Sequence, residues 1–218
     1  MGLEARLHRL PQPEIDYVYL TSLLRDYARP RQEISRLLGK RALIRVKKGL
    51  YIVTSDNQVP YSKEVLANLV YGPSYISLDY ALRLHGLIPE RVEEVTSVTC
   101  NREKTFATPV GVFSYRYLRP ALFSHGVTQG ESITGRSFLV ATPEKALIDK
   151  IWFLSQDNDP KDLEAFLFND LRIDPGAFAR LNIKKMNSLI AHYRGPKVAC
   201  ATSLAALGEL ITRNGDKQ

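Results

Sequence analysis

Basic side chains are concentrated in one short segment of this chain, residues 29–48. The segment contains one acidic residue, Glu33, and eight basic residues: Arg29, Arg31, Arg36, Lys40, Arg41, Arg45, Lys47 and Lys48. Its net charge of +7 equals that of the whole chain, which has 30 Lys and Arg against 23 Asp and Glu. The rest of the sequence is therefore neutral overall. A neutral protein with one strongly basic segment has the charge pattern of a polyanion-binding surface.

The spacing of apolar residues in this segment predicts how the cations are displayed. A helix beginning at Pro30, a residue suited to a first helical position, has one apolar side made of Ile34, Leu37, Leu38 and Ala42. The opposite side then exposes Arg31, Gln32, Ser35, Arg36 and Lys40. Next the period becomes that of a strand, because Ile44 and Val46 alternate with Arg45 and Lys47. A return strand over residues 50–53 completes a predicted hairpin with a cationic tip.

Upstream, we predict a strand at residues 15–20 and a short helix at residues 23–27, capped by Thr21 and Ser22. A winged helix-turn-helix has the same order of elements: a short helix, a turn, a basic helix and a basic hairpin. In that motif the second helix enters the major groove and the hairpin contacts phosphates. We therefore predict a DNA-binding domain over residues 1–56. The predicted contacts are Arg29, Arg31, Gln32, Ser35, Arg36, Lys40, Arg41, Arg45, Lys47 and Lys48. The alternative is an amphipathic helix with a solvated basic side, next to an ordinary hairpin.

A second region, residues 57–218, begins within a polar linker predicted at residues 55–60, and it is predicted to be α+β, with strands early and helices late. Ser62 and Ser77 are predicted helix caps, and Thr142-Pro143-Glu144 is a strong helix start. Strands are predicted at 92–100, 111–118 and 138–141, and a loop at 123–135. Later helices are predicted at 161–168, 175–181, 186–193 and 198–213. The whole chain is thus predicted to be α+β.

Few residues in this sequence are arranged for catalysis. The four histidines have no metal-ligand spacing with one another or with Cys100 and Cys200, so we expect no metal and no cofactor. Glu144, Lys145 and Asp149 lie on one predicted helix, and carboxylates with a lysine can organise a metal and a phosphate. They define an alternative function, a nucleic-acid-modifying enzyme with a winged-helix targeting arm. That alternative requires a further carboxylate close to Glu144.

Several stretches of the second region resemble the AbiEi-type antitoxin family of type IV toxin–antitoxin systems, which act in phage abortive infection. They are GPSYISLDYALRLHGLIPE at 72–90, residues 94–118, and LVATPEKALIDKIW at 139–152, with KKGLY at 47–51 as in the family's winged helix. The resemblance implies a repressor that binds inverted repeats in its own promoter. It also implies that the second region is an antitoxin domain, countering a nucleotidyltransferase toxin without necessarily forming a stable complex.

The family motifs fall on Ser77, His85, Thr142, Glu144, Lys145 and Asp149, among other positions. Several of these are predicted caps or helix-core positions, so their role could be folding or toxin control. The sequence has no run of roughly 18 apolar residues and no signal-peptide core, so we expect a cytoplasmic protein without a membrane partner. It also lacks a heptad repeat, which favours a monomer in solution. The resemblance implies cooperative loading on DNA.

Overall fold

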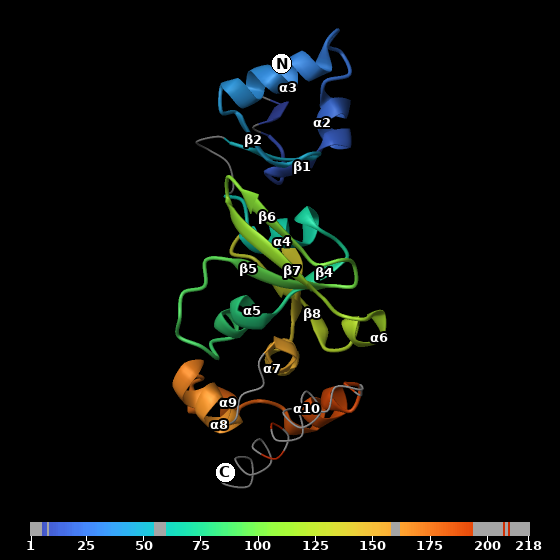
Figure 1. Ribbon diagram of the computed structural model, residues 1–218. Helices are drawn as coiled ribbons and strands as arrows, with labels where there is room; N and C mark the ends of the chain where they lie inside the picture. The colour runs from blue at the N-terminus through green and yellow to red at the C-terminus, as the bar shows by residue number, and fades with distance from the viewer. Residues whose placement is uncertain are drawn as a thin grey trace.

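The structure, a computed structural model, describes residues 6, 7, 9–54, 60–157, 162–193, 207 and 209. These residues form a mixed α+β fold with two β-sheets, strands mostly early and helices mostly late, which confirms the predicted class. The elements follow one another along a long axis, with α2 and α3 at one end and α8, α9 and α10 at the other (Figure 1). Among the described helices, none has the length and apolarity needed to cross a bilayer.

The N-terminal elements are two helices and a small antiparallel sheet. Their bounds are β1 Glu14–Asp16, α2 Tyr17–Leu23, α3 Pro30–Gly39, β2 Leu43–Lys47 and β3 Leu50–Val53. The strand order is β1-β3-β2. The basic helix begins at Pro30 as predicted, with Ile34 and Leu37 buried beneath it, but it ends at Gly39, so Ala42 lies beyond the helix. The hairpin strands lie where the sequence predicted them. Gly49 has a φ of 87°, which the hairpin turn requires and which glycine adopts without strain.

The predicted short helix at residues 23–27 and strand at residues 15–20 are wrong. The strand ends at Asp16 and the helix starts at once, because the Asp16 carboxylate accepts a hydrogen bond from the Tyr19 backbone amide at 2.7 Å. Thr21 and Ser22 lie inside this helix and donate their hydroxyls back to carbonyls of the preceding turn. They therefore cap nothing. Ser, Thr and Asp all favour caps, and the sequence alone did not show which of them takes the position.

The small sheet is buried on both faces. Leu43 and Tyr51 pack with α2 and α3 in an N-terminal core, whereas Val46, Leu50 and Ile52 pack into the core of the second region. The sheet is therefore a shared layer between the two parts of the chain. The predicted linker falls mostly on residues 55–59, which lie outside the described residues.

The second region contains a six-stranded mixed sheet with the order β6-β7-β5-β4-β9-β8. Its strands are β4 Ser74–Ile76, β5 Val95–Thr99, β6 Lys104–Thr108, β7 Gly111–Tyr117, β8 Val127–Glu131 and β9 Ser137–Ala141. Its helical segments are α4 Lys63–Val70, α5 Leu78–Leu84, α6 Pro120–Phe123, α7 Pro143–Asp157, α8 Leu163–Ala165, the π-helical turn Phe166–Asp170, α9 Pro175–Ala179 and α10 Ile183–Ile190.

Helices cover both faces of this sheet. The Tyr115 hydroxyl of β7 donates to the Ala67 carbonyl of α4, so α4 lies on that face. The next residues along β7, Ser114 and Arg116, point the other way and line a cavity with Lys150 of α7. The sheet is therefore sandwiched between α4 on one side and α5 with α7 on the other, and α10 packs on α7.

Some predictions for this region are confirmed and others are wrong. The helix starts at Ser62 and Thr142-Pro143 are confirmed, and the predicted helix at 175–181 is α9, capped by Asp174. The predicted loop at residues 123–135 is wrong, because it contains α6 and strand β8, which pairs antiparallel with β9. The predicted helix at 161–168 continues as a π-helical turn to Asp170. The predicted helix at 198–213 lies almost wholly outside the described residues, of which Leu207 and Glu209 are helical.

Candidate nucleic-acid interface

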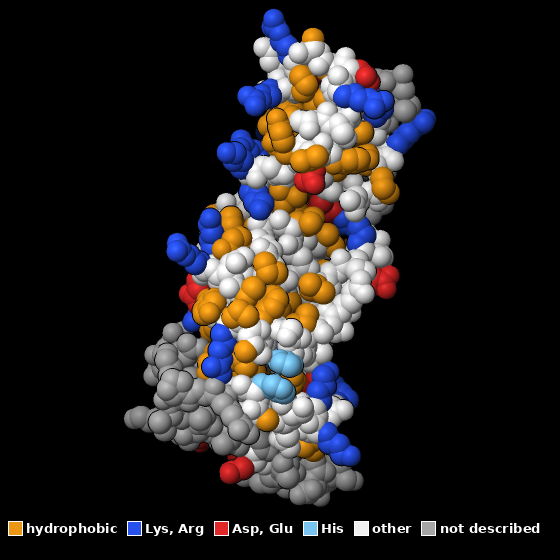
Figure 2. Space-filling view, turned by 90° about the vertical axis from the view of Figure 1, so that its right-hand side faces the viewer, with side chains coloured by type: hydrophobic (Ala, Val, Ile, Leu, Met, Phe, Trp, Pro, Cys, Tyr) orange, Lys and Arg blue, Asp and Glu red, His pale blue; other side chains and the backbone are white. Residues whose placement is uncertain are grey.

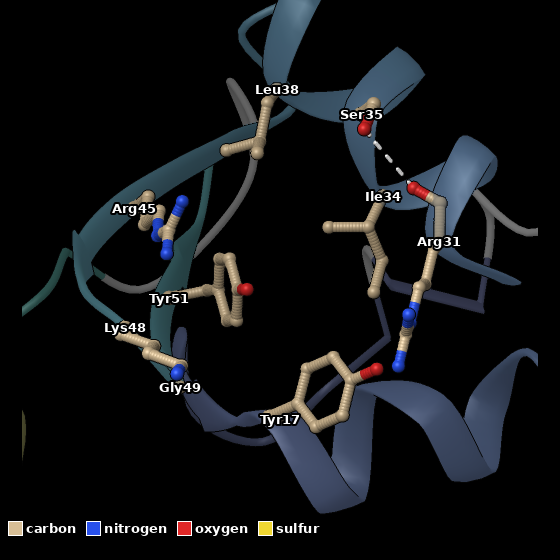
Figure 3. Close-up of a pocket in the computed structure, with 9 residues that line it drawn as sticks. All are labelled: Tyr17, Arg31, Ile34, Ser35, Leu38, Arg45, Lys48, Gly49 and Tyr51. Carbon is tan, nitrogen blue, oxygen red and sulfur yellow. Dashed lines mark hydrogen bonds between the residues drawn. The ribbon is translucent and has the colours of Figure 1, made fainter.

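Three cations from three different elements converge on one surface of the N-terminal part. Arg31 comes from α3, Arg45 from β2, and Lys48 from the turn between β2 and β3. They line a cavity of about 610 Å³ between the helix and the hairpin (Figure 3), and none of its described lining residues is acidic. Among the described residues, none of the three cations forms an ion pair. The cavity is therefore electrostatically suited to an anion.

Tyr17 is part of this surface and lines both of its cavities, and the sequence reasoning missed it. Its ring lines the main cavity together with Arg31 and Lys48, and it also lines a smaller neighbouring cavity of about 420 Å³ with Arg29 and Gln32. Its backbone amide donates to the Gly49 carbonyl at 2.9 Å, which ties the start of α2 to the hairpin turn. The useful signal was Asp16, since capping by Asp16 puts Tyr17 in the first turn of α2.

The outer side of α3 presents polar side chains, as predicted. Gln32, Ser35, Arg36 and Lys40 are exposed, as are Arg29 before the helix and Arg41 after it. Arg36 is held by Glu33 at 2.8 Å, an ion pair one turn apart on the helix. The Ser35 hydroxyl donates to the Arg31 carbonyl at 3.1 Å (dashed in Figure 3). On the face shown in Figure 2, Lys and Arg side chains predominate over acidic ones at the N-terminal end.

Lys47 lies apart from the other cations of the hairpin. Its ammonium donates to the Val70 carbonyl at the end of α4, and the side chain is half-buried. Desolvation by burial, and to a smaller extent the nearby Lys104, lowers the pKa of Lys47. The register of β2 against β3 shifts between Arg45 and Lys47, a bulge that helps to send the two side chains in different directions. The structure thus places Lys47 against the second region and Arg45 and Lys48 on the cavity surface.

A buried ion pair also connects the two parts of the chain. Glu14 of β1, which is 2% exposed, pairs with Arg136 of the turn between β8 and β9. The same carboxylate accepts hydrogen bonds from Arg136 at 3.0 Å and from the backbone amide of Ser62 at 2.9 Å. Ser62 is the cap of α4, so one carboxylate joins the first strand of the small sheet to two elements of the second region. This arrangement fixes the orientation of the basic surface relative to the second region.

The motif residues of the second region meet in a buried polar network centred on Asp149. One carboxylate oxygen accepts hydrogen bonds from Ser77 at 2.8 Å and from Tyr75 at 3.0 Å. The other accepts from Tyr193 at 2.5 Å and pairs with Lys145 at 2.9 Å. Lys145 and Asp149 are both fully buried. The predicted cap at Ser77 is therefore wrong in detail, since its hydroxyl serves Asp149, and Thr96 instead accepts from the backbone amide of Tyr80 in the first turn of α5.

The electrostatics of this network follow from its burial. Desolvation lowers the pKa of Lys145, and the attraction of Asp149 opposes that shift. Burial, reinforced by the charge of Asp149, raises the pKa of Tyr75 and Tyr193 well above the ordinary value. The Lys145 ammonium also donates to the Leu122 carbonyl at 3.1 Å and contacts the Tyr193 hydroxyl. Every hydrogen-bonding group of the ion pair is thereby engaged by protein atoms, as a stable buried charge requires.

Glu144 belongs to a separate network. Its carboxylate pairs with Lys185 of α10 at 3.1 Å and accepts from the Asn182 backbone amide at 3.2 Å. Burial alone would raise the pKa of Glu144, but hydrogen bonds from its own backbone amide, Lys185, Thr142 and Asn182 outweigh burial and lower it. No described carboxylate joins Glu144 in a metal-binding group. Glu144 and Asp149 therefore lie in separate hydrogen-bond networks and have different partners.

The remaining candidate residues have structural partners. The His85 ring nitrogen Nε2 bonds to the Ala141 carbonyl at 2.7 Å and ties the end of α5 to β9. The His125 and His192 rings stack with their centroids 4.1 Å apart. Cys100 is a free thiol and Cys200 lies outside the described residues. Within the described parts of the chain, no three His, Cys, Asp or Glu side chains are grouped to hold a metal ion.

Comparison of the sequence with protein-family models gives no match, and comparison with curated proteins gives none either. The functional assignment therefore depends on the residues and geometry described above.

Proposed function

We propose that this protein is a DNA-binding repressor and antitoxin of the AbiEi type. The single observation that carries the DNA-binding part is the convergence of Arg31, Arg45 and Lys48 on a cavity whose described lining contains no acidic residue. These residues come from a helix, a strand and a turn, so the fold itself collects the charge. Arg and Lys side chains that converge in this way neutralise phosphates of a duplex.

The N-terminal elements support assignment as a winged helix-turn-helix. In this proposal α2 and α3 form the helix pair, α3 enters the major groove, and the β2–β3 hairpin is the wing. Gln32, Ser35 and Arg36 are exposed along α3 and would contact base edges. Arg36 would exchange its pairing with Glu33 for a base. Arg45 and Lys48 would hold phosphates, whereas Lys47 would support the interface between the two parts of the chain.

For the second region we propose the antitoxin activity, directed at a nucleotidyltransferase toxin. The resemblance of residues 72–90 and 139–152 to the AbiEi family supports it. The geometry adds that Ser77, Lys145 and Asp149 hold each other inside the fold, which favours a folding role for these motif positions. We expect the toxin to be countered without a stable complex, and the protein to be cytoplasmic, monomeric in solution and cooperative on DNA repeats.

The DNA-binding proposal is tested by measuring affinity for promoter DNA upstream of the protein's own gene across a range of salt concentrations. Replacing Arg31, Arg45 and Lys48 together by alanine removes three phosphate contacts and lowers the slope of log affinity against log salt by about 2.7. The control replaces Arg91, Arg172 and Lys184 of the second region by alanine, which removes the same charge from exposed positions. If the two triple variants lose the same amount of DNA affinity and salt slope, net charge alone attracts DNA.

The antitoxin proposal has its own test, co-expression with the nucleotidyltransferase toxin encoded beside the gene. The full-length variant lacking Arg31, Arg45 and Lys48 should still rescue growth, because these residues lie on the N-terminal surface. Repression of a promoter fusion should be lost in the same cells. Failure of the wild-type chain to rescue growth would remove the antitoxin assignment and leave the DNA-binding proposal intact.

A further inference from the structure

The cavity between α3 and the hairpin has more apolar surface than contact with phosphates requires. Its lining includes Ile34 and Leu38 from α3, Tyr51 from β3 and Tyr17 from α2, and their side chains surround one common space (Figure 3). Phosphate contacts are made by cations, hydroxyls and amides, and they gain nothing from aliphatic or aromatic walls. The volume of about 610 Å³ is that of a small-molecule pocket. These walls are suited to a ligand that carries apolar surface.

The cations at the edge of the cavity require that the ligand also carry a negative charge. Arg31, Arg45 and Lys48 form no ion pair with any described residue, and the described residues that line the cavity include no carboxylate to repel an anion. Figure 3 shows the Arg31 side chain extending toward the Tyr17 ring, with Arg45 and Lys48 on the opposite, hairpin side. A ligand that uses both kinds of surface must combine a negative group with a planar or aliphatic body.

We propose that this cavity binds a small anion bearing an aromatic ring, of the mononucleotide class, and that its occupancy excludes DNA. The phosphate would lie in the space between Arg31 on the α3 side and Arg45 and Lys48 on the hairpin side, and the ring would lie against Tyr17 and the apolar side of α3. Stacking on an aromatic side chain tolerates any base, because every base has a π-face. The exclusion of DNA rests on the proposed function, since both ligands would use the same three cations. Binding of the nucleotide does not depend on it.

The first experiment compares three probes on the full-length protein: adenosine monophosphate, inorganic phosphate and adenosine. Calorimetry measures direct binding, and displacement of labelled promoter duplex is measured at matched ionic strength. The nucleotide should bind and displace DNA at concentrations about tenfold below those of phosphate or adenosine. Of the three probes, it is the one that contacts both the apolar walls and the cations of the cavity. Equal potency of nucleotide and phosphate would overturn the inference and leave a merely cationic surface.

Single substitutions separate the contribution of the apolar walls to nucleotide binding from that of the cations. Tyr17→Ala should weaken nucleotide binding about tenfold and leave the response to inorganic phosphate unchanged, whereas Tyr17→Phe should retain nucleotide binding. Tyr19→Ala is the matched control, because Tyr19 is exposed on the same helix and does not line the cavity. Ser35→Trp fills the cavity from an exposed position of α3, so it should block the nucleotide without disturbing the core.

The two proposals fail in distinguishable ways. Nucleotide binding without DNA binding would refute the proposed function and leave the ligand site standing. DNA binding without calorimetric nucleotide binding would refute the ligand site alone. Nucleotide binding that leaves the duplex in place would overturn the exclusion. Nucleotide binding that Ser35→Trp does not affect would place the ligand elsewhere and overturn the assignment to this cavity.

Discussion

Two sets of basic residues, one in each part of this molecule, have opposite environments. In the N-terminal part Arg31, Arg45 and Lys48 are exposed and unpaired among the described residues, and they lie beside a cavity. In the second region Lys145 is fully buried with Asp149, and Arg136 is largely covered against Glu14. The first arrangement leaves charge available to an external anion, and the second uses charge to hold elements together. The comparison therefore predicts that mutations in the first set alter binding and mutations in the second set alter stability.

The largest expected effect is at the buried pair of the second region. Lys145→Ala leaves the Asp149 carboxylate buried without its cation and opens a cavity, so we expect a loss of about 3–5 kcal/mol in the free energy of unfolding. The control is Lys150→Ala on the same helix. Lys150 pairs with Asp79 at 2.8 Å, but both side chains are partly solvated, so the loss should stay below about 1 kcal/mol. Urea denaturation measures both, and equal losses would refute the distinction.

The connection between the two parts should give the next largest effect. Arg136→Ala leaves Glu14 buried without a cation, and we expect a loss of about 3 kcal/mol. Glu14→Gln combined with Arg136→Met removes both charges and should cost less than the single change. The exposed pair of Arg172 with Glu90 supplies the control, since Arg172→Ala should change stability by less than about 1 kcal/mol. A double variant that is less stable than Arg136→Ala would argue against a buried, coupled pair.

Neighbouring lysines at the hairpin tip offer a sharper comparison. Lys47→Met removes the hydrogen bond to the Val70 carbonyl and should cost about 1 kcal/mol of stability, with little effect on DNA affinity. Lys48→Met should leave stability unchanged within about 0.5 kcal/mol and lower the salt slope of DNA binding by about 0.9. Thermal denaturation and binding titrations on both variants test this crossover. A DNA-binding loss in Lys47→Met equal to that in Lys48→Met would contradict the separation.

Elements with local signals were predictable from the sequence. Pro30 and Thr142-Pro143 mark helix starts, and Asp174 before Pro175 marks another, because caps and N-terminal prolines act within one turn. The hairpin followed from its alternation and from Gly49. For the site, the charge of residues 29–48 followed from composition alone, and the exposed side of α3 followed from helical periodicity.

What the sequence did not predict depends on contacts between distant residues. Strand β8 has the polar sequence VTQGE and is a strand because β9 pairs with it, so its composition carries no signal. The environment of Lys47 depends on where α4 lies, which no local pattern shows. Tyr17 was missed for a related reason, because its importance comes from lying between α3 and the hairpin turn. The network around Asp149 likewise joins Tyr75, Lys145 and Tyr193 only after the sheet has formed.

The last expected effect, similar in size to that of Lys47→Met, concerns the acid stability that the Glu144 network provides. Hydrogen bonds lower the folded-state pKa of Glu144, so its contribution is present above the unfolded value near 4.5 and is lost as pH falls through the folded value. We expect Glu144→Gln to cost about 1 kcal/mol at neutral pH and to flatten the fall in melting temperature between about pH 5 and pH 3. Glu94→Gln, at an exposed carboxylate, is the control. If Glu144→Gln has the same pH profile as the wild type, the Lys185 and Asn182 contacts do not hold the carboxylate ionised. The contrast between exposed, unpaired charges and buried, paired charges would then depend on Lys145 and Arg136 alone.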